Sequence, residues 1–371
     1  MRNAALTALA TTVLNMTAMS GASAQRPAAP AASYPRDTIT ARLAELRRIH
    51  TPNGIETLEP LEINGSRQWI SIRGLDRNNP VLFVLHGGPG SSLMGMSWAY
   101  QRPWEDYFTV VNWDQRGSGK SFSAADSARL GPTMTEQQLA DDAAAVMAHV
   151  RKTLGARKMV VLAFSHGTIF GPLLVNQHAE WVSAYVTIGE GSAENEREMF
   201  RNLFELATAK GDTATLRQLN AMRPYPPVGR EPTTRELLAM RAIVQRYGGA
   251  WYGKTDLSLY SRMWDWAPEF SLDEVANISP AVAWTNRHLI DGQGGHKGAS
   301  ETDYRVPVIM LHGRHDLMDT YSGAKAYFDR IRAPKKEFIT FEHSAHFLMF
   351  EEPGRLLVTL VQKVLPLATG R

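Results

Sequence analysis

From residue 81 onward the chain alternates short, continuously apolar runs with longer segments of helical periodicity. A strand with one wet face alternates apolar and polar residues, whereas a run without a polar face is typical of a strand buried inside a parallel sheet. The apolar runs lie at residues 81–85, 107–113, 159–164, 181–188, 306–311 and 337–341. This alternation predicts the α/β fold class, with a doubly wound, mostly parallel sheet between layers of helices.

Two features at other places support this organisation. Residues 58–63 and 68–72 favour strands and flank Asn64-Gly65, a dipeptide suited to the positive φ angles of a tight hairpin turn. Between residues 135 and 155 we predict a helix, because Thr135 and Gln138 can form a capping box and a glycine commonly ends a helix.

The interval from residue 192 to residue 301 breaks the rhythm. It contains helical stretches at residues 194–210, 213–222 and 235–247, but no clear strand. The pattern therefore predicts an inserted helical cap at 192–301, while residues 36–191 and 302–371 form the core.

The N-terminus has the features of an export signal. Arg2 precedes a mildly apolar run at residues 4–19, and small residues at 21–24 end in a cleavage site after Ala24. A membrane anchor is the alternative, but the run is shorter than the roughly 20 apolar residues that span a bilayer. We expect a signal peptide at 1–24, an Ala- and Pro-rich linker at 25–35, a periplasmic or secreted protein, and no stable membrane insertion after cleavage.

The charge balance argues against nucleic acid as a partner, and the cysteine count excludes two kinds of covalent modification. Lysine and arginine number 40 against 37 acidic residues, so no strong field attracts nucleic acid. The chain has no cysteine, which removes a disulfide framework and a lipid-modified N-terminal cysteine. A small-molecule or short-peptide substrate is the better expectation.

A candidate nucleophile lies in Ala163-Phe164-Ser165-His166-Gly167, between an apolar run and a helical segment. In a nucleophile elbow the serine occupies a strained turn between strand and helix, so small residues are needed two positions before and after it. Such a match by itself is common in ordinary turns and helix caps. Its place after a buried strand favours Ser165 as a nucleophile.

A second candidate motif, His86-Gly87-Gly88-Pro89-Gly90, directly follows the run at 81–85. Glycines let the backbone turn and direct N–H groups at the oxyanion that forms when a serine attacks a carbonyl. A phosphate-binding loop is the alternative, but it would need a Lys followed by Ser or Thr, or G-x-G-x-x-G spacing. The motif therefore favours an oxyanion loop.

A serine nucleophile needs a base and a group that orients the base. The expected chain order is serine, acid, histidine, with the histidine after the last strand. His346 has this position, and Asp316 follows the preceding strand. We therefore predict a triad of Ser165, Asp316 and His346, with His343 as a neighbouring loop residue.

Two other groups of polar residues have a competing interpretation. His312-x-x-His315-Asp316 and His343-x-x-His346 together contain enough ligands for zinc, but a metal site leaves the elbow and the oxyanion loop unexplained. We therefore predict neither a metal nor a cofactor.

The charged turn at residues 114–121 is interpreted as scaffold beside the oxyanion loop.

Taken together, these motifs resemble the proline iminopeptidase branch of the α/β-hydrolases, peptidase family S33. His-Gly-Gly-Pro-Gly at 86–90 and Asp-Gln-Arg-Gly-Ser-Gly-Lys-Ser at 114–121 are close to signatures of that family. The resemblance implies an α/β-hydrolase fold and release of an N-terminal residue, often proline, from short peptides. By motif position it implies that Ser165, Asp316 and His346 are catalytic and that backbone N–H groups of Gly88 and His166 form the oxyanion hole, in the loop that contains Gly87.

The chain departs from the family in two places. His166 follows the nucleophile where the family commonly has tryptophan, and the cap, whose carboxylates bind the free amine in the family, is poorly matched. Acidic residues near the start of the cap are Glu190, Glu194, Glu196 and Glu198. We take Glu196, Trp264, Asp265 and Trp266 as candidate substrate-binding residues, and a solvated helix face is the alternative for each acid.

The sequence leaves three functions open. The first is an exported aminopeptidase that releases N-terminal proline or another small residue through an acyl-enzyme. The second keeps the chemistry but acts on an ester, lactone or amide. The third is a ligand-binding protein without turnover, because a fold does not establish an activity.

Overall fold

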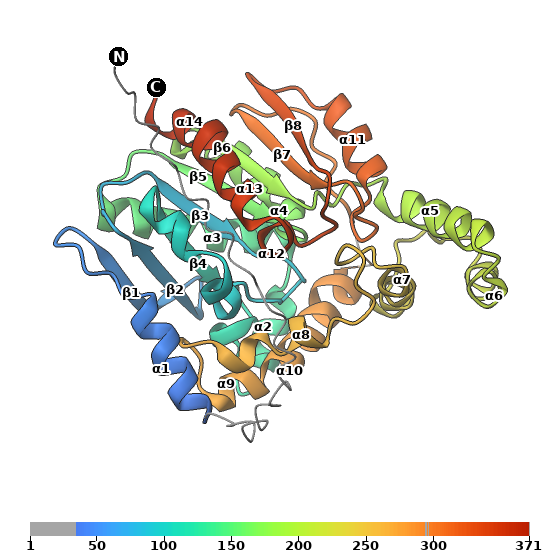
Figure 1. The fold of residues 1–371 in the computed structure, drawn as a ribbon, viewed down its shortest axis with the longest axis horizontal. Helices are drawn as coiled ribbons and strands as arrows, with labels where there is room; N and C mark the ends of the chain where they lie inside the picture. The colour runs from blue at the N-terminus through green and yellow to red at the C-terminus, as the bar shows by residue number, and fades with distance from the viewer. Residues whose placement is uncertain (1–34, 294, 296, 371) are drawn as a thin grey trace, which may run out of the picture. The chain divides into compact units, whose positions relative to one another are not determined.

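An eight-stranded sheet lies at the centre of the computed structural model, which describes residues 35–293, 295 and 297–370 (Figure 1). The strands follow the order β1-β2-β4-β3-β5-β6-β7-β8 across the sheet. They are β1 (Ile55–Ile63), β2 (Ser66–Gly74), β3 (Val81–Leu85), β4 (Thr109–Asp114), β5 (Met159–Phe164), β6 (Val182–Ile188), β7 (Val308–Gly313) and β8 (Lys336–Phe341). All eight correspond to runs that the sequence predicts, with ends that differ by a few residues.

Most neighbouring strands are parallel, as predicted. Only β1 with β2 and β2 with β4 pair antiparallel among the named strands of the described chain. The hairpin between β1 and β2 turns at Asn64 and Gly65, which have φ angles of 47° and 73°. A short polar turn with positive φ therefore fixes the register of this hairpin, as the dipeptide indicates.

Both faces of the central strands are covered, which explains why β3 to β7 have no exposed position, whereas β1 at the edge of the sheet does. In β3, Val81, Phe83 and Leu85 belong to one hydrophobic cluster, while Leu82 and Val84 belong to another. The first cluster packs against α3 (Glu136–Leu154), α4 (Gly167–Gln177) and α11 (Tyr321–Arg330). The second includes residues of α13 (Pro353–Thr359) and of the π-helical segment that follows it. The doubly wound arrangement is thus confirmed.

The segment between β6 and β7 is helical and contains no named strand in its described part. Its helices are α5 (Asn195–Ala209), α6 (Thr213–Ala221), α7 (Thr234–Arg246), α8 (Ser258–Ser261), α9 (Leu272–Ala276) and α10 (Ile278–Thr285). The remaining helices are α1 (Arg36–Leu46), α2 (Ser127–Leu130), α12 (Leu348–Glu351) and α14 (Leu365–Thr369). We call the segment from α5 to α10, together with residues 286–293, the cap.

The cap contacts the core at the loops that carry the predicted motifs. Thr285 Oγ1 donates to the carbonyl of Gly117 at 2.9 Å, and Asn286 Nδ2 donates to the carbonyl of Pro89 at 3.3 Å. Residues Arg36 to Arg371 accordingly form one compact unit.

The predicted signal peptide at 1–24 and all but the last residue of the predicted linker lie outside the described residues. Within the described part of the chain, no helix is long and apolar enough to cross a membrane.

Candidate active site

Ser165 lies on the sharp turn between β5 and α4, with a φ of 52°. A non-glycine residue in this left-handed region is strained, so the surrounding backbone must hold it there. The Ser165 N–H donates to the carbonyl of Ile188 at 2.9 Å, and its carbonyl accepts from the Thr168 N–H at 2.7 Å. A Cβ at Gly167 would lie 2.5 Å from the carbonyl oxygen of Leu85, so the turn requires glycine at this position.

His346 and Asp316 form a buried pair behind the serine. The His346 Nδ1 lies 2.9 Å from Asp316 Oδ2, and the other carboxylate oxygen accepts the N–H groups of Met318 and Asp319 at 2.8 and 3.0 Å. A Cβ at Gly189 would lie 2.7 Å from His346 Cε1, so the imidazole packs directly on this glycine. Burial by itself lowers the pKa of His346, but the carboxylates of Asp316 and Asp319 together outweigh it and the pKa is raised above its ordinary value.

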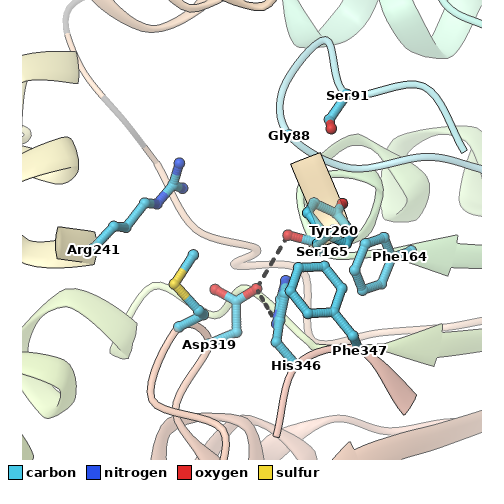
Figure 2. A pocket seen from close by; sticks show the side chains of 10 residues that line it. Gly88, Ser91, Phe164, Ser165, Arg241, Tyr260, Asp319, His346 and Phe347 are labelled. Carbon is cyan, nitrogen blue, oxygen red and sulfur yellow. Dashed lines mark hydrogen bonds and ion pairs between the residues drawn. The ribbon is translucent and has the colours of Figure 1, made fainter. Parts of the chain in front are cut away.

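A second carboxylate reaches the same site. Asp319 Oδ2 lies 3.5 Å from Ser165 Oγ, which donates to it, and 3.9 Å from His346 Nδ1 (Figure 2). Asp319 Oδ1 accepts from Asn195 Nδ2 at 3.1 Å, which orients the carboxylate. Burial raises the pKa of Asp319 to about 7, although the nearby His346 and Arg241 act in the opposite direction.

Sequence reasoning missed Asp319. The only signal was its place three residues after Asp316 in the same loop, and a carboxylate there is not by itself distinctive. In the free protein the Ser165 hydroxyl is directed at Asp319 instead of His346. Catalytic hydrogen bonds are often long or poorly aligned before substrate binds, so this geometry is compatible with His346 as base.

The predicted oxyanion loop lies against the serine. A Cβ at Gly87 would lie 2.7 Å from Ser165 Cβ, and Gly88, with a φ of 117°, lines the same pocket. His166 is buried immediately before α4, where its ring lies 6.1 Å from that of Phe170. The backbone amides of Gly88 and His166 therefore belong to segments that border the nucleophile.

The charged turn after β4 supports this loop. The Gln115 N–H donates to His86 Nε2 at 3.2 Å, and burial lowers the pKa of His86 to about 4, so its ring is neutral. Arg116 makes a buried ion pair with Asp142 at 2.8 Å, and Asp114 Oδ2 accepts from the Lys120 N–H at 2.7 Å. These contacts agree with a scaffold role for residues 114–121.

The remaining candidate residues of the cap lie apart from the serine. Glu196 is buried, accepts from the Tyr225 hydroxyl and lines a different cavity. The Trp264 Nε1 donates to the carbonyl of Ser92 at 3.3 Å, and Asp265 pairs with Arg262 at 3.2 Å. Neither Asp265 nor Trp266 is among the residues that line the pocket of Ser165.

The other three acids near the start of the cap also lie outside the pocket of Ser165. Glu194 pairs with Arg330 at 2.8 Å, and Glu198 accepts from Ser322 Oγ at 2.8 Å. Glu190 is fully buried just after β6, which raises its pKa to about 8. None of these three lines the pocket of Ser165.

The residues of the alternative zinc site come together only in part, because His312 Nε2 and His346 Nδ1 lie 3.7 and 2.9 Å from Asp316 Oδ2. His312 Nε2 hydrogen-bonds to the carbonyl of Asp319 at 2.7 Å, and the ring of His315 stacks on Tyr252 at 4.1 Å. Among the described residues, no group of three or more His, Cys, Asp or Glu side chains is arranged to hold a metal ion.

The pocket of Ser165 has a volume of about 140 Å³. The core contributes Gly88, Ser91, Phe164, Ser165, Met318, Asp319, His346 and Phe347, and the cap contributes Arg241 from α7 and Tyr260 from α8 (Figure 2). A second cavity of about 670 Å³ lies between α7 and α10, and Ser91 borders both cavities. Its apolar lining includes Leu238, Trp264, Ile278 and Val282.

Comparison with known proteins places this geometry in a family. The chain is 27% identical over 313 residues to a protein of Bacillus subtilis (strain 168) named probable aminopeptidase YbaC, covering 82% of this chain and 95% of that protein. The structure is similar to that of a proline iminopeptidase from Mycobacterium smegmatis, with a TM-score of 0.57, 17% identity and coverage of 85% of this chain and 99% of the other.

It is also similar to the carboxylesterase CesB (YbfK) from Bacillus subtilis, with a TM-score of 0.54, 17% identity and coverage of 91% and 98%. The family described as alpha/beta hydrolase fold matches residues 80–353, which include the elbow, the oxyanion loop, Asp316 and His346. This chain therefore belongs to the alpha/beta hydrolase fold family.

Proposed function

We propose that this protein is a serine aminopeptidase that releases proline or another small residue from the N-terminus of peptides. The observation that carries this proposal is the Asp319 carboxylate, 3.5 Å from Ser165 Oγ. An α-ammonium nitrogen lies about 2.5 Å from the carbonyl carbon of its own residue, so a serine that attacks an N-terminal residue has the ammonium close by. Asp319 is the one carboxylate among the described residues that line this pocket.

Charge supports this assignment of the ammonium site. Asp319 is buried and, within the described residues, has no ion pair with Lys or Arg, while its basic neighbour His346 Nδ1 lies at 3.9 Å. A buried carboxylate is stabilised by a direct cationic partner, which a substrate ammonium would supply. By taking Asp319 Oδ2, the ammonium would also release the Ser165 hydroxyl to donate to His346.

The reaction follows from these positions. Ser165 Oγ bonds to the carbonyl carbon while its proton passes to His346 Nε2, and backbone N–H groups of Gly88 and His166 stabilise the oxyanion. The C–N bond then breaks, and the leaving amine takes the proton from His346. Water attacks the acyl-enzyme with His346 as base, which releases the amino acid and restores the Ser165 hydroxyl.

A panel of substrates tests the function. Proline and alanine nitroanilides should be hydrolysed, whereas N-acetylated proline nitroanilide and a nitrophenyl ester without an amine should be poor substrates. Asp319→Asn should raise KM for the free aminoacyl nitroanilides by roughly 10- to 100-fold, since a charge-assisted hydrogen bond is lost. The same change at Asp273, an exposed acid of α9, is the matched control. If Glu196→Gln raises KM and Asp319→Asn does not, the ammonium site lies at Glu196.

A second function has a specific observation in its favour. The apolar cavity of about 670 Å³ borders Ser91 of the catalytic pocket and could take the acyl chain of an ester. An esterase would hydrolyse apolar nitrophenyl esters faster than any aminoacyl nitroanilide and would ignore N-acetylation. That result would replace the aminopeptidase proposal.

We also propose that residues 1–24 direct export of the chain and that cleavage follows Ala24. Expression of the full chain in a bacterium with an outer membrane, followed by N-terminal sequencing of the periplasmic fraction, tests this. The expected mature N-terminus is Gln25, and a cytoplasmic product that keeps Met1 would contradict it.

A further inference from the structure

Arg241 is the cation that the cap directs at the nucleophile. It lies on α7, is half-buried and lines the pocket together with Ser165 and Asp319. Figure 2 shows its side chain extending from the cap side of the cavity, opposite Ser165 and Phe164. Arg241 is not part of any motif predicted from the sequence, so those motifs assign no role to its guanidinium.

Within the described residues, Arg241 has no ion pair and no side-chain hydrogen bond. The two nearby acids are committed elsewhere, because Glu196 accepts from Tyr225, and Asp319 is hydrogen-bonded to Asn195 and Ser165. Arg241 lowers the pKa of both Glu196 and Asp319 through space, without an ion pair to either carboxylate. A guanidinium carries five N–H donors in a fixed plane, so those of Arg241 remain available to a ligand in the cavity.

The pocket therefore contains the carboxyl group of Asp319 and the guanidinium of Arg241, which do not form an ion pair with each other. A planar guanidinium matches a carboxylate, with which it can form two parallel hydrogen bonds. In an extended dipeptide the ammonium and carboxylate groups are separated by about 6–7 Å, and they lie on either side of the scissile peptide bond. A cavity of about 140 Å³ is also smaller than the roughly 300–1,000 Å³ of sites for larger ligands.

We propose that this pocket selects short peptides with both termini free, binding the ammonium at Asp319 and the C-terminal carboxylate at Arg241. The inference rests on the proposed aminopeptidase function and narrows its substrate class to peptides of about two residues. Arg241 is then a specificity-determining residue that contacts the leaving half of the substrate.

The test compares Ala-Ala with Ala-Ala-amide, which differ only in the terminal carboxylate, and uses alanine nitroanilide to report the basal activity. The wild-type enzyme should have a kcat/KM for Ala-Ala at least roughly 10-fold above that for the amide. Arg241→Gln should lower kcat/KM for Ala-Ala by a factor roughly 10-fold or more larger than the factor for the amide, mainly through KM. Arg241→Lys, which keeps the charge but not the planar fork, should lie between them.

Arg235→Gln is the matched control, because Arg235 lies on the same helix but lines the second cavity. It should leave the ratio of the two substrates unchanged. Equal losses on Ala-Ala and its amide in Arg241→Gln would overturn the inference, as would a wild-type preference for the amide. Hydrolysis of alanine nitroanilide together with indifference to the carboxylate would overturn the inference but leave the aminopeptidase proposal intact. Absence of activity on all three substrates would instead overturn the proposed function.

Discussion

The core side and the cap side of the catalytic pocket are built in different ways. On the core side, Gly88, Ser165, Asp319 and His346 lie on loops that directly follow β3, β5, β7 and β8. On the cap side, Arg241 and Tyr260 lie on helices that reach the pocket through packing against the core. The carboxyl ends of parallel strands meet at one edge of a sheet, so the first group converges by topology. The second group converges only if the cap docks correctly.

This difference separates chemistry from selection. The core side contains every group of the proposed acyl transfer, namely the nucleophile, the base, the orienting acid and the oxyanion loop. The cap side adds a charge and an aromatic wall, which in the proposed reaction contact the substrate without taking part in bond making. We therefore expect core substitutions to reduce turnover of all substrates and cap substitutions to affect only some.

The largest effect is expected for Ser165→Ala. The nucleophile is lost, so kcat should fall by roughly 10⁵- to 10⁶-fold for every substrate. The melting temperature should hardly change, because among the described residues the hydroxyl makes one long hydrogen bond, of 3.5 Å to Asp319. Nitroanilide kinetics and thermal unfolding measure both quantities, and reaction with a fluorophosphonate probe should disappear. Activity that survives in this variant would refute the core side as the source of chemistry.

The next largest effect is expected for Asp316→Asn, at roughly 10⁴-fold in kcat. With Oδ1 still accepting two backbone N–H groups, the new amide nitrogen would face His346 Nδ1 and favour the wrong tautomer.

The pH profile of this variant gives a second readout. His346 must be neutral to act as base, so kcat/KM rises with pH through its pKa. Since Asp316 raises that pKa, the rising limb should move to lower pH in Asp316→Asn. If the rising limb does not move, the pKa of His346 is instead controlled by Asp319, whose Oδ2 lies 3.9 Å from His346 Nδ1.

The smallest effect is expected for Leu238→Ser, in the second cavity. Leu238 is 56% exposed, so its loss should change the free energy of unfolding by no more than about 0.5 kcal/mol. Turnover of aminoacyl nitroanilides should stay within about 2-fold, because their ammonium and carbonyl lie in the pocket of Ser165. Hydrolysis of an apolar nitrophenyl ester should fall by a larger factor if the second cavity binds acyl chains. A large loss on aminoacyl substrates would show that the two cavities act as one site.

By itself, the sequence predicted the architecture and the core side of the site except for Asp319. Continuous apolar runs identified β3 to β8, because a strand covered on both faces has few polar positions. The strand-favouring segments on either side of Asn64-Gly65 identified β1 and β2. The elbow at Ser165 and the loop at 86–90 were recognisable because strained or crowded backbone admits few residue types. The positions of Asp316 and His346 followed from their place after consecutive strands.

Only the tertiary structure decided which charges face the nucleophile. Asp319 reaches Ser165 because the Asp316 carboxylate turns the intervening backbone, and Arg241 arrives from α7. Glu196, which the sequence favoured as the amine ligand, is instead held by Tyr225 outside this pocket. Cap docking depends on contacts such as Thr285 to Gly117, which are 168 residues apart in the chain. Local patterns record the period and the turns of a segment, but they do not record which distant side chain will pack against it.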